Sequence, residues 1–597
     1  NPDNILPRYL PGQNMTGQEF GGTRQEHNYK ITEIFLREKI ALSLGLQQLD
    51  VFITRILKTL FHQSSKLDEK KLHLLLNYDP HHAMMTLDES ASSKANGIIY
   101  LGNKGVNLVR MNDFGLPVPP CFIVTTEVFR CLTIIDEFAR ARQNFEEKIT
   151  KRIRTIERVT GKRFADPKNP LLFSVRSGSS ISQPGMMDTF LNVGINEDIA
   201  TGLAVETDNA FFAWDCYRRF LQGWGMSYGI DRNNFDALIA EAKKKQGVSK
   251  KRLLGGEGMK KVALAYKSMI YDSGYEIVEN PFDQLLYTIK SVLESWESDK
   301  AKIYRKIMGI SDDWGTAVTI QAMVFGNMSQ TSGTGVFFTH NPRQSGGGMK
   351  LWGDFTVEDQ GEDVVSGLVN TMPISISQQN FEKRSTDIIL ETHFPEIYTT
   401  LREWAGKLIY EKGWGPQEME FTFESPSKND LHLLQTRDMA MRKHKKVTTF
   451  HPESIEKRKK IGNGIGVSGG AMSGRVVFTL EEIDRWRKKE PKTHLILIRG
   501  DTVPDDISEI FAADGLLTAR GGLTSHAAVV AHRLGKTCVV GCGNLECNED
   551  ARKCAFDSIL LKSGGKISID GHEGSVYEGD MKFKENQSRS SEIWKTV

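Results

Sequence analysis

The stretch QEMEFTFESPSKNDLHLLQTR, residues 417–437, contains two runs of alternating apolar and polar residues with a turn-rich segment between them. Alternation places every second side chain on one face of a strand, so Glu418 and Glu420 share a face, as do Gln435 and Arg437. The two runs predict a β-hairpin that gathers two carboxylates, an amide and a guanidinium. Such a set suits Mg²⁺ and a transferring phosphoryl group. The alternative is a surface hairpin with cross-strand ion pairs.

A second stretch, LLFSVRSGSSISQPGMMDTFLNVG at 171–194, predicts a strand over 173–175 with Arg176 at its end. The Ser/Gly-rich loop that follows leaves backbone N–H groups open to an anion, and arginine matches phosphate geometry. This pattern favours phosphate recognition, with a structural ion pair of Arg176 as the alternative.

The segment IIYLGNKGVNL (98–108) predicts a strand, a glycine turn and the start of a helix. Glycines at 102 and 105 would let the backbone approach an anion, and Lys104 adds a mobile positive charge. A glycine turn with a surface lysine is the competing interpretation. The segment is not a P-loop, because it lacks GxxxxGK[ST].

A fourth motif, TARGGLTSHAAVVAHRLGK, occupies 518–536. After the glycine pair, Thr524 or Ser525 can cap a helix that begins near His526. The positive end of the helix dipole would favour a neutral, nucleophilic imidazole and would stabilise a phosphoryl group on its ring. His532 lies about 120° away around the helix, so the two histidines do not form a metal pair.

The 597 residues are enough for about three to five domains. Lys+Arg 77 against Asp+Glu 75 gives a net charge of +2, which excludes a globally basic nucleic-acid-binding protein or a largely disordered one. The basic stretch 442–460 lacks interleaved aromatic residues and predicts a solvated linker. Seven cysteines without CxxC pairs predict reduced thiols and a cytoplasmic location.

The N-terminal part predicts an extended arm over 1–25, a helix over 30–63 and a short helix over 68–76. An apolar stripe runs along the longer helix, through Leu49, Phe52, Ile53, Ile56, Leu57 and Leu60. We interpret these helices as a cap on the next domain, or alternatively as a dimerisation or regulatory element, which leaves a homodimer open. No uncharged apolar run reaches membrane-spanning length, so no membrane partner is expected.

Several motifs together resemble pyruvate, phosphate dikinase, and resemble its relative phosphoenolpyruvate synthase less closely. They are GNKGVNL, FSVRSGSSISQPGMMDT, WDCYRRF, DWGTAVTIQAMVFGN, SGTGVFFTHNP, DQGEDVVSG, QEMEF, LLQTR and RGGLTSHAAVVAHRLGKTCVVG. The resemblance runs from about residue 97 to 580. It implies an α/β multi-domain protein with an ATP-grasp nucleotide-binding domain and a swivelling β/β/α phosphohistidine domain.

The resemblance also implies site residues. His526 would be the phosphorylated residue, with Arg437 and Arg176 as catalytic partners, and Thr524 a regulatory phosphorylation site. Residues that would bind ATP are Lys104, Arg176, Gly185, Thr189, Glu418, Glu420, Gln435 and Arg437, of which Glu418 and Glu420 would hold Mg²⁺.

Some positions depart from the family pattern. His340 stands where arginine is usual, Asp354 where glutamate is usual, and Glu418 where aspartate is usual. The linker after LLQTR is short, and the family's C-terminal barrel, which binds pyruvate and phosphoenolpyruvate, is not seen.

The expected domains are 1–95 (arm and helices), 96–441 (nucleotide binding), 442–463 (hinge linker), 464–580 (phosphohistidine) and 581–597 (tail). The expected function is ATP-dependent phosphorylation of His526 with release of AMP, and transfer to pyruvate in the full-length enzyme; phosphate as a co-substrate stays open. Two alternatives remain: a module that serves a partner subunit or another small-molecule acceptor, and a non-catalytic nucleotide-binding regulator.

Overall fold

The computed structural model describes residues 24–64, 66–87, 97–181, 183, 185–342, 348–366, 371–382, 384, 386–439, 447–502, 506–522, 525–549 and 551–586. The chain divides into two compact units, Asn1–Tyr78 and Asp79–Val597. Thr524 and most of the predicted N-terminal arm lie outside the described residues.

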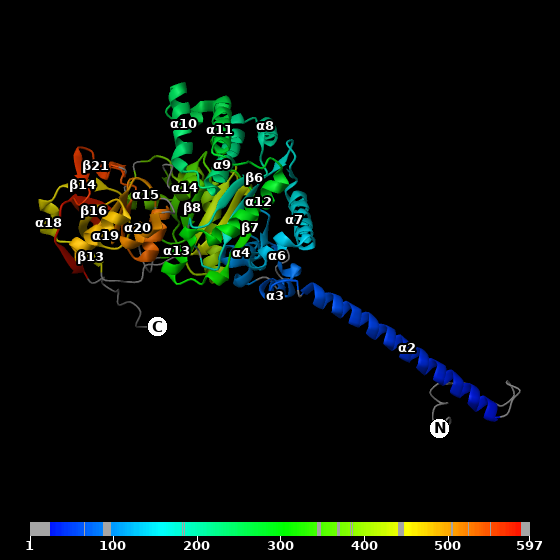
Figure 1. Cartoon of the computed structure of the whole chain (residues 1–597). Helices are drawn as coiled ribbons and strands as arrows, with labels where there is room; N and C mark the ends of the chain where they lie inside the picture. Colours follow the sequence, from blue (N-terminus) through cyan, green and yellow to red (C-terminus); the bar gives the residue numbers. More distant parts are fainter. Residues whose placement is uncertain are drawn as a thin grey trace. The chain divides into compact units, whose positions relative to one another are not determined.

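The first unit contains the continuous 41-residue helix α2 (Arg24–Ser64) and the short helix α3 (Glu69–Asn77) (Figure 1). Both match the predicted helices. Asp68 caps α3 by accepting a hydrogen bond from the backbone N–H of Lys71 at 2.9 Å. The segment Thr32–His62 is long and apolar enough to cross a membrane by length and composition alone. This corrects the sequence expectation, which considered uncharged runs only.

The second unit begins with two antiparallel sheets of five strands each. The order of the first sheet is β1 (Met84–Thr86), β2 (Cys121–Val124), β7 (Ala317–Ala322), β5 (Phe173–Gly178) and β6 (Thr189–Val193). The order of the second sheet is β10 (Met372–Pro373), β9 (Trp352–Val357), β8 (Gly333–Phe338), β11 (Gln417–Phe423) and β12 (Leu431–Asp438). The predicted hairpin is therefore confirmed as β11 and β12.

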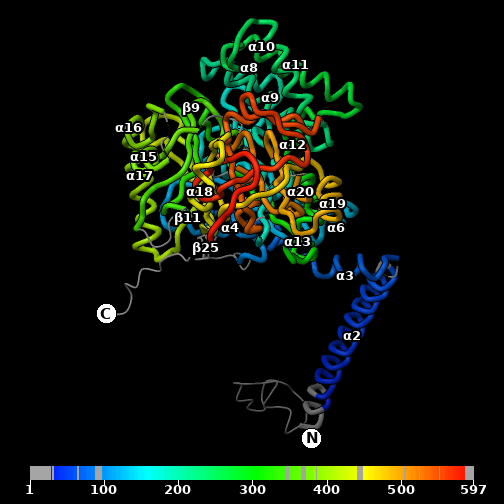
Figure 2. Tube along the Cα trace, turned by 90° about the vertical axis from the view of Figure 1, so that its left-hand side faces the viewer, coloured from blue at the N-terminus to red at the C-terminus, as the bar shows by residue number. Residues whose placement is uncertain are grey.

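Some helices pack on these sheets, and others form a separate helical group. The packed helices include α4 (Ile98–Asp113), α5 (Thr126–Arg130), α6 (Leu132–Glu137), α7 (Ala139–Thr160), α12 (Pro281–Glu294), α13 (Asp299–Met308), α14 (Gly361–Ser366), α15 (Ile376–Glu382), α16 (Leu390–His393) and α17 (Pro395–Gly406). The group, side by side in Figures 1 and 2, comprises α8 (Glu197–Glu206), α9 (Ala210–Ser227), α10 (Arg232–Gln246) and α11 (Gly255–Asp272).

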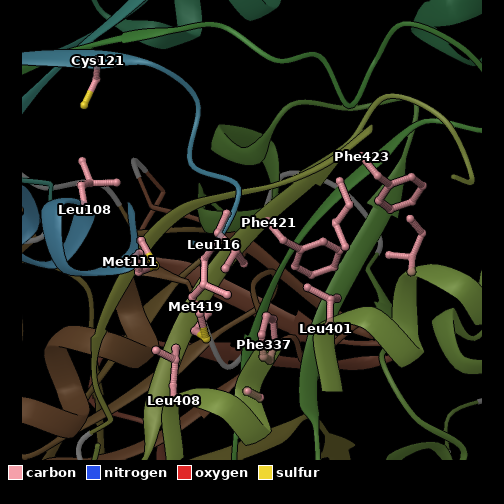
Figure 3. Packing of buried hydrophobic residues seen from close by; sticks show 14 of the residues in the cluster. Leu108, Met111, Leu116, Cys121, Phe337, Leu401, Leu408, Met419, Phe421 and Phe423 are labelled. Carbon is pink, nitrogen blue, oxygen red and sulfur yellow. The ribbon is translucent and has the colours of Figure 1, made fainter. Parts of the chain in front are cut away.

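A buried aromatic and aliphatic core holds the hairpin in place (Figure 3). Phe421 on β11 packs against Phe337 on β8, with ring centroids 5.8 Å apart. Met419 and Leu108 join the same core from β11 and α4. The apolar face of β11 is therefore fixed, and its opposite face, which carries the two glutamates, is directed away from the core.

The remaining residues form a second α/β region around an eight-stranded sheet. Its order is β14 (Lys460–Asn463), β24 (Ser575–Glu578), β23 (Lys566–Asp570), β16 (Ala471–Val477), β17 (Leu495–Arg499), β18 (Gly515–Thr518), β19 (Thr537–Val540) and β15 (Ile465–Ser468). The other elements are β13 (Val447–Phe450), β25 (Phe583–Asn586), β20 (Leu545–Asn548), β21 (Lys553–Phe556), β22 (Ile559–Lys562), α18 (Pro452–Lys457), α19 (Leu480–Lys489), α20 (Ile507–Ala512) and α21 (His526–Leu534). The predicted mixed α/β organisation is confirmed.

Two sequence expectations are wrong in part. Residues 447–463 are not linker, because β13 pairs with β25 and β14 pairs with β24. The same pairing removes 583–586 from the predicted tail. The other error concerns Ile98–Leu101, which is helical rather than a strand, since α4 begins at Ile98 and bends at Gly102. A short apolar run has no periodicity that distinguishes a helix from a strand.

Candidate functional site

The glutamates and the arginine of the hairpin meet across its two strands. Glu418 lies opposite Arg437 and Glu420 lies opposite Gln435 in the register. The guanidinium of Arg437 donates a hydrogen bond to Glu418. Burial alone would lower the pKa of Arg437, but the carboxylates of Glu418 and Glu420 raise it, so the guanidinium stays charged. The structure thus brings these four predicted residues together.

Arg176 reaches this cluster from the other sheet. It lies on β5, and its Nη1 is 3.5 Å from Oε2 of Glu420. Its Nη2 donates hydrogen bonds to the Gln321 side chain and, at 3.4 Å, to the backbone carbonyl of Leu434. The side chain therefore bridges the two sheets, and it carries a positive charge to the polar face of the hairpin.

Lys104 is the third cation of the cluster. Burial, together with the guanidinium of Arg176, lowers the pKa of Lys104 to about 8, while Glu420 opposes the shift and Arg437 adds to it. A lysine with this pKa is still mostly charged at neutral pH, and it titrates within the physiological range.

The bend in α4 explains how Lys104 reaches this place. Gly102 has φ 65° and ψ 176°, so the helix is interrupted and starts again beyond it. A Cβ on Gly102 would lie 1.9 Å from the carbonyl oxygen of Gly178, so only glycine allows this approach. The Asn103 N–H donates to the Ser179 carbonyl at 3.0 Å. The glycine turn is thus confirmed, although its first half is helical.

The remaining predicted nucleotide residues lie around the arginine loop. Thr189 begins β6 directly opposite Arg176. Gly185 lies in the loop between β5 and β6, exposed and with φ 71°. Thr189 therefore adjoins the cation cluster, and Gly185 contributes the backbone conformation of the loop that leads to it.

The carboxylates fit Mg²⁺ by their chemistry. Mg²⁺ is commonly held by one or two carboxylates together with substrate phosphates rather than by a complete protein cage. Glu418 and Glu420 match this pattern, whereas no group of three or more His, Cys, Asp or Glu residues suited to a metal occurs in the described part of the chain. These two glutamates would hold the ion only together with a bound phosphate chain.

His526 is the first residue of α21, as the sequence predicts. Ser525 is the N-cap, and its Oγ accepts a hydrogen bond from the Ala528 N–H at 3.4 Å. Ala527 and Ala528 are buried, and the imidazole Nδ1 lies 3.5 Å from Oγ1 of Thr502. The imidazole thus sits at the positive end of a capped helix.

The segment that carries His526 lies against the second five-stranded sheet. A Cβ on Gly522 would lie 3.1 Å from Oδ2 of Asp354 on β9. The helix that carries His526 also shares a cavity with the hairpin, lined by Phe338, Pro342, Glu418, Arg437, Asp438, Met439, Val467, Ala528, Val529, His532 and Arg533. Arg533 donates a hydrogen bond to Tyr304 at 3.3 Å. His532, for which no functional role was predicted, lines this cavity.

The three residues that depart from the family pattern, Asp354, His340 and Glu418, each have a polar partner in the structure. Asp354 is fully buried, and its Oδ1 accepts hydrogen bonds from Arg384 at 2.7 Å and from Thr371 at 3.2 Å. Burial lowers the pKa of His340, whose Nδ1 is 2.9 Å from Oγ1 of Thr339. Glu418 pairs with Arg437, so none of the three departures removes the cluster.

One buried charge cluster was not predicted from the sequence. Asp215 on α9 accepts hydrogen bonds from Arg218 at 2.7 Å and Arg219 at 2.9 Å, and Arg219 also binds Asp363 on α14. Burial alone would raise the pKa of Asp215, but Arg218, Lys251 and Arg219 hold it well below its usual range. The cluster ties the helical group to the DQGEDVVSG segment. Apart from Lys251, the residues of the cluster lie in the motifs WDCYRRF and DQGEDVVSG. Because both motifs resemble the same family, that shared resemblance could have indicated a contact between them.

Comparison with known proteins matches both regions. A family model described as pyruvate phosphate dikinase, AMP/ATP-binding domain, matches residues 135–458. A second, described as PEP-utilising enzyme, mobile domain, matches residues 491–574. The first covers the hairpin, Arg176 and the buried charge cluster, and the second covers His526.

Similar curated proteins carry the name pyruvate, phosphate dikinase. The chain is 36% identical over 520 residues to the enzyme of Clostridium symbiosum. The alignment covers 81% of this chain and 57% of the relative. It is 37% identical over 512 residues to that of Rickettsia typhi, covering 81% and 56%. It is 38% identical over 495 residues to a chloroplastic one of Arabidopsis thaliana, covering 80% and 51%. The chain spans about half the length of the curated relatives it matches.

Proposed function

The chain belongs to the pyruvate, phosphate dikinase family, and we propose that it phosphorylates its own His526 from ATP and releases AMP. A ring nitrogen of His526 bonds to the β-phosphorus of ATP, the bond from that phosphorus to the bridging oxygen breaks, and AMP leaves with the electron pair. An oxygen of inorganic phosphate then bonds to the γ-phosphorus, the bond from that phosphorus to the β–γ bridging oxygen breaks, and pyrophosphate leaves, so that the β-phosphoryl group stays on His526. The convergence of Lys104, Arg176 and Arg437 on one hairpin face supports this proposal most directly.

The three cations have different roles in this proposal. Lys104, on the restarted turn of α4, supplies a point charge to the phosphate chain. Arg176 and Arg437 supply planar donor pairs that match phosphate oxygens and offset charge in the transition state. Gln435, which is almost fully buried opposite Glu420, would offer the nucleotide a neutral hydrogen-bonding group beside them.

Glu418 and Glu420 would hold Mg²⁺ in the same proposal. The bound ion would supply positive charge to the phosphate oxygens. Both carboxylates are already paired with a guanidinium, Glu418 with Arg437 and Glu420 with Arg176. The side chains are thus held at the polar face of the hairpin before a ligand arrives.

For the full-length protein we propose pyruvate as the final acceptor, which gives phosphoenolpyruvate. Pyruvate loses a proton from its methyl carbon, the resulting enolate oxygen bonds to phosphorus, and the bond from phosphorus to the His526 nitrogen breaks, which returns its electron pair to the imidazole. The printed names of the relatives and of the mobile-domain family model support this step. We further propose a swivelling motion of the region from 447 to 586, which would carry the histidine between donor and acceptor.

We also propose a cytoplasmic location. All seven cysteines are free thiols, and six of them are buried. Free thiols in this number are typical of a reducing compartment. The regulatory role of Thr524 and the lack of a nucleic-acid partner remain predictions.

The test is a labelling experiment with ATP that carries its label on the β-phosphate, with Mg²⁺ and phosphate present. The wild-type chain should become labelled and release AMP, and the label should be lost in acid, as expected for a phosphorus–nitrogen bond. His526→Ala should abolish labelling. His572→Ala, which changes an exposed histidine of the same region, should leave it intact. Acid-stable label, or label that persists in His526→Ala, would refute the proposal.

A further inference from the structure

The long helix α2 exposes an unusual number of large apolar side chains. Leu46, Leu49 and Leu60 have exposed fractions of 65%, 51% and 59%. A helix that leaves such side chains in water gains little stability from them. Contiguous exposed apolar surface of this kind indicates a contact surface for another molecule.

The spacing of one subset of these side chains favours a particular contact. Six of the exposed apolar residues recur at alternating intervals of four and three residues, Leu42, Leu46, Leu49, Ile53, Ile56 and Leu60, whereas others, such as Ile40, Leu44 and Val51, lie outside this series. This is a heptad repeat, with Leu46, Ile53 and Leu60 at a positions and the other three at d positions. Phe35 and Lys39 extend it by one further d and one further a position. We call these eight residues the heptad seam.

A heptad repeat fits another helix with the same repeat. An a/d seam drifts around a straight helix and stays in contact only when two such helices supercoil. The seam spans 25 residue steps, about 38 Å at 1.5 Å per residue. A second copy of the chain supplies an identical seam of identical length.

The charges of α2 argue against a membrane as the partner. Asp50 and Arg55 lie within the apolar stretch that has membrane-spanning length, and both would be costly at the centre of a bilayer. In a coiled coil they occupy e and c positions, outside the a/d layers, where water remains. The same charges are therefore compatible with helix pairing and poorly compatible with insertion.

We propose that α2 pairs with α2 of a second copy in a parallel two-stranded coiled coil. Lys39 decides the direction. In a parallel pair the two Lys39 side chains form one polar layer near the N-terminal end of the seam. In an antiparallel pair centred on the seam, each Lys39 would instead face the apolar Ile56. A single polar a position of this kind specifies register at some cost in stability.

The test measures the mass of the full chain in solution by light scattering across a wide range of concentration. A dimer should have twice the 67.1 kDa of one chain. Ile53→Glu places a charge in the seam and should give a monomer. Val51→Glu is the matched control, because Val51 has a similar exposed fraction (49% against 45%) but lies at an f position outside the seam. A monomeric wild type, or two variants with equal effects, would overturn the proposal.

Cross-linking tests the parallel register. In air, Leu46→Cys should form a disulfide between the two copies. Oxygen is the oxidant, and each pair of thiols loses two protons and two electrons. Leu44→Cys, on the outer face, should not. Equal cross-linking of the two variants overturns the register. Flotation with phosphatidylcholine and phosphatidylglycerol vesicles tests the membrane alternative. If the chain binds the vesicles as a monomer and no dimer is found, the proposal is overturned. Thermal unfolding of each variant checks that the second unit stays folded.

Discussion

The pKa of Lys104 predicts that ATP binds more weakly as the pH rises through about 8. Burial and the guanidinium of Arg176 disfavour the ammonium form, so Lys104 loses its proton well below the usual pH for a lysine. Below this pH the side chain attracts the phosphate chain, and above it the attraction is lost. If binding requires the charged form, the apparent Kd should rise about tenfold from pH 7 to pH 9, or about 1.4 kcal/mol.

The assay is titration calorimetry with a non-hydrolysable ATP analogue and Mg²⁺, in a His526→Ala background that prevents turnover. Lys104→Arg keeps the charge at every pH and should remove the slope between pH 7 and pH 9. Lys104→Met should bind weakly at both pH values. A flat profile for the background protein, or an unchanged slope in Lys104→Arg, would contradict the assignment.

The same shift makes a prediction about stability. Because the folded pKa lies below the unfolded value of 10.5, charged Lys104 destabilises the folded protein at neutral pH. Lys104→Met should therefore unfold at a higher temperature than the wild type at pH 7. The gap should shrink as the pH rises from 8 towards 10.5, where the unfolded chain also loses its proton. A lower melting temperature for the variant at pH 7 would show that the lysine contributes net stability.

Two further variants test the packing around the site. Arg219→Leu leaves buried carboxylates such as Asp215 short of a guanidinium and should cost about 3–5 kcal/mol of unfolding free energy in urea titrations; a loss below about 1 kcal/mol would contradict this. Gly522→Ala adds a methyl group 3.1 Å from Asp354 and should slow histidine labelling by about fivefold or more, with ATP affinity unchanged. Gly543→Ala, which meets nothing within 4 Å, should label at the wild-type rate, and equal rates for the two glycine variants would refute the contact.

The parts of the site that could be predicted from sequence are those with a short-range period. Alternation gave the correct face for Glu418 and Glu420, because the other face of that strand is fixed by buried residues such as Phe421. It did not foresee the β-bulge in the register between Gln435 and Leu433, which turns Gln435 and Arg437 towards the glutamates. The capped helix at His526 was predictable because its signals, a glycine pair and Ser525, are adjacent in the chain. Each of these features depends on residues within a few positions of one another.

The parts that could not be predicted depend on distant residues. Arg219 and Asp363 form their ion pair across 144 positions, and no local pattern joins two helices at that distance. The strand at 447–450 was hidden for the same reason, because its partner strand lies at 583–586. Its basic surroundings indicated a linker, but the pairing is set by the tertiary fold.

The charge balance of the hairpin gives a physical reason for combining glutamates with cations at a phosphate site. Arg437 pairs with Glu418 and Arg176 with Glu420, so each guanidinium already has its charge partly offset. In the function we propose, an ATP phosphate chain would therefore compete with a carboxylate for each arginine. If Mg²⁺ occupies the carboxylates, both arginines become available to the phosphates at the same time. The two glutamates would then couple nucleotide binding to the metal, which would account for their position on the same face as the cations.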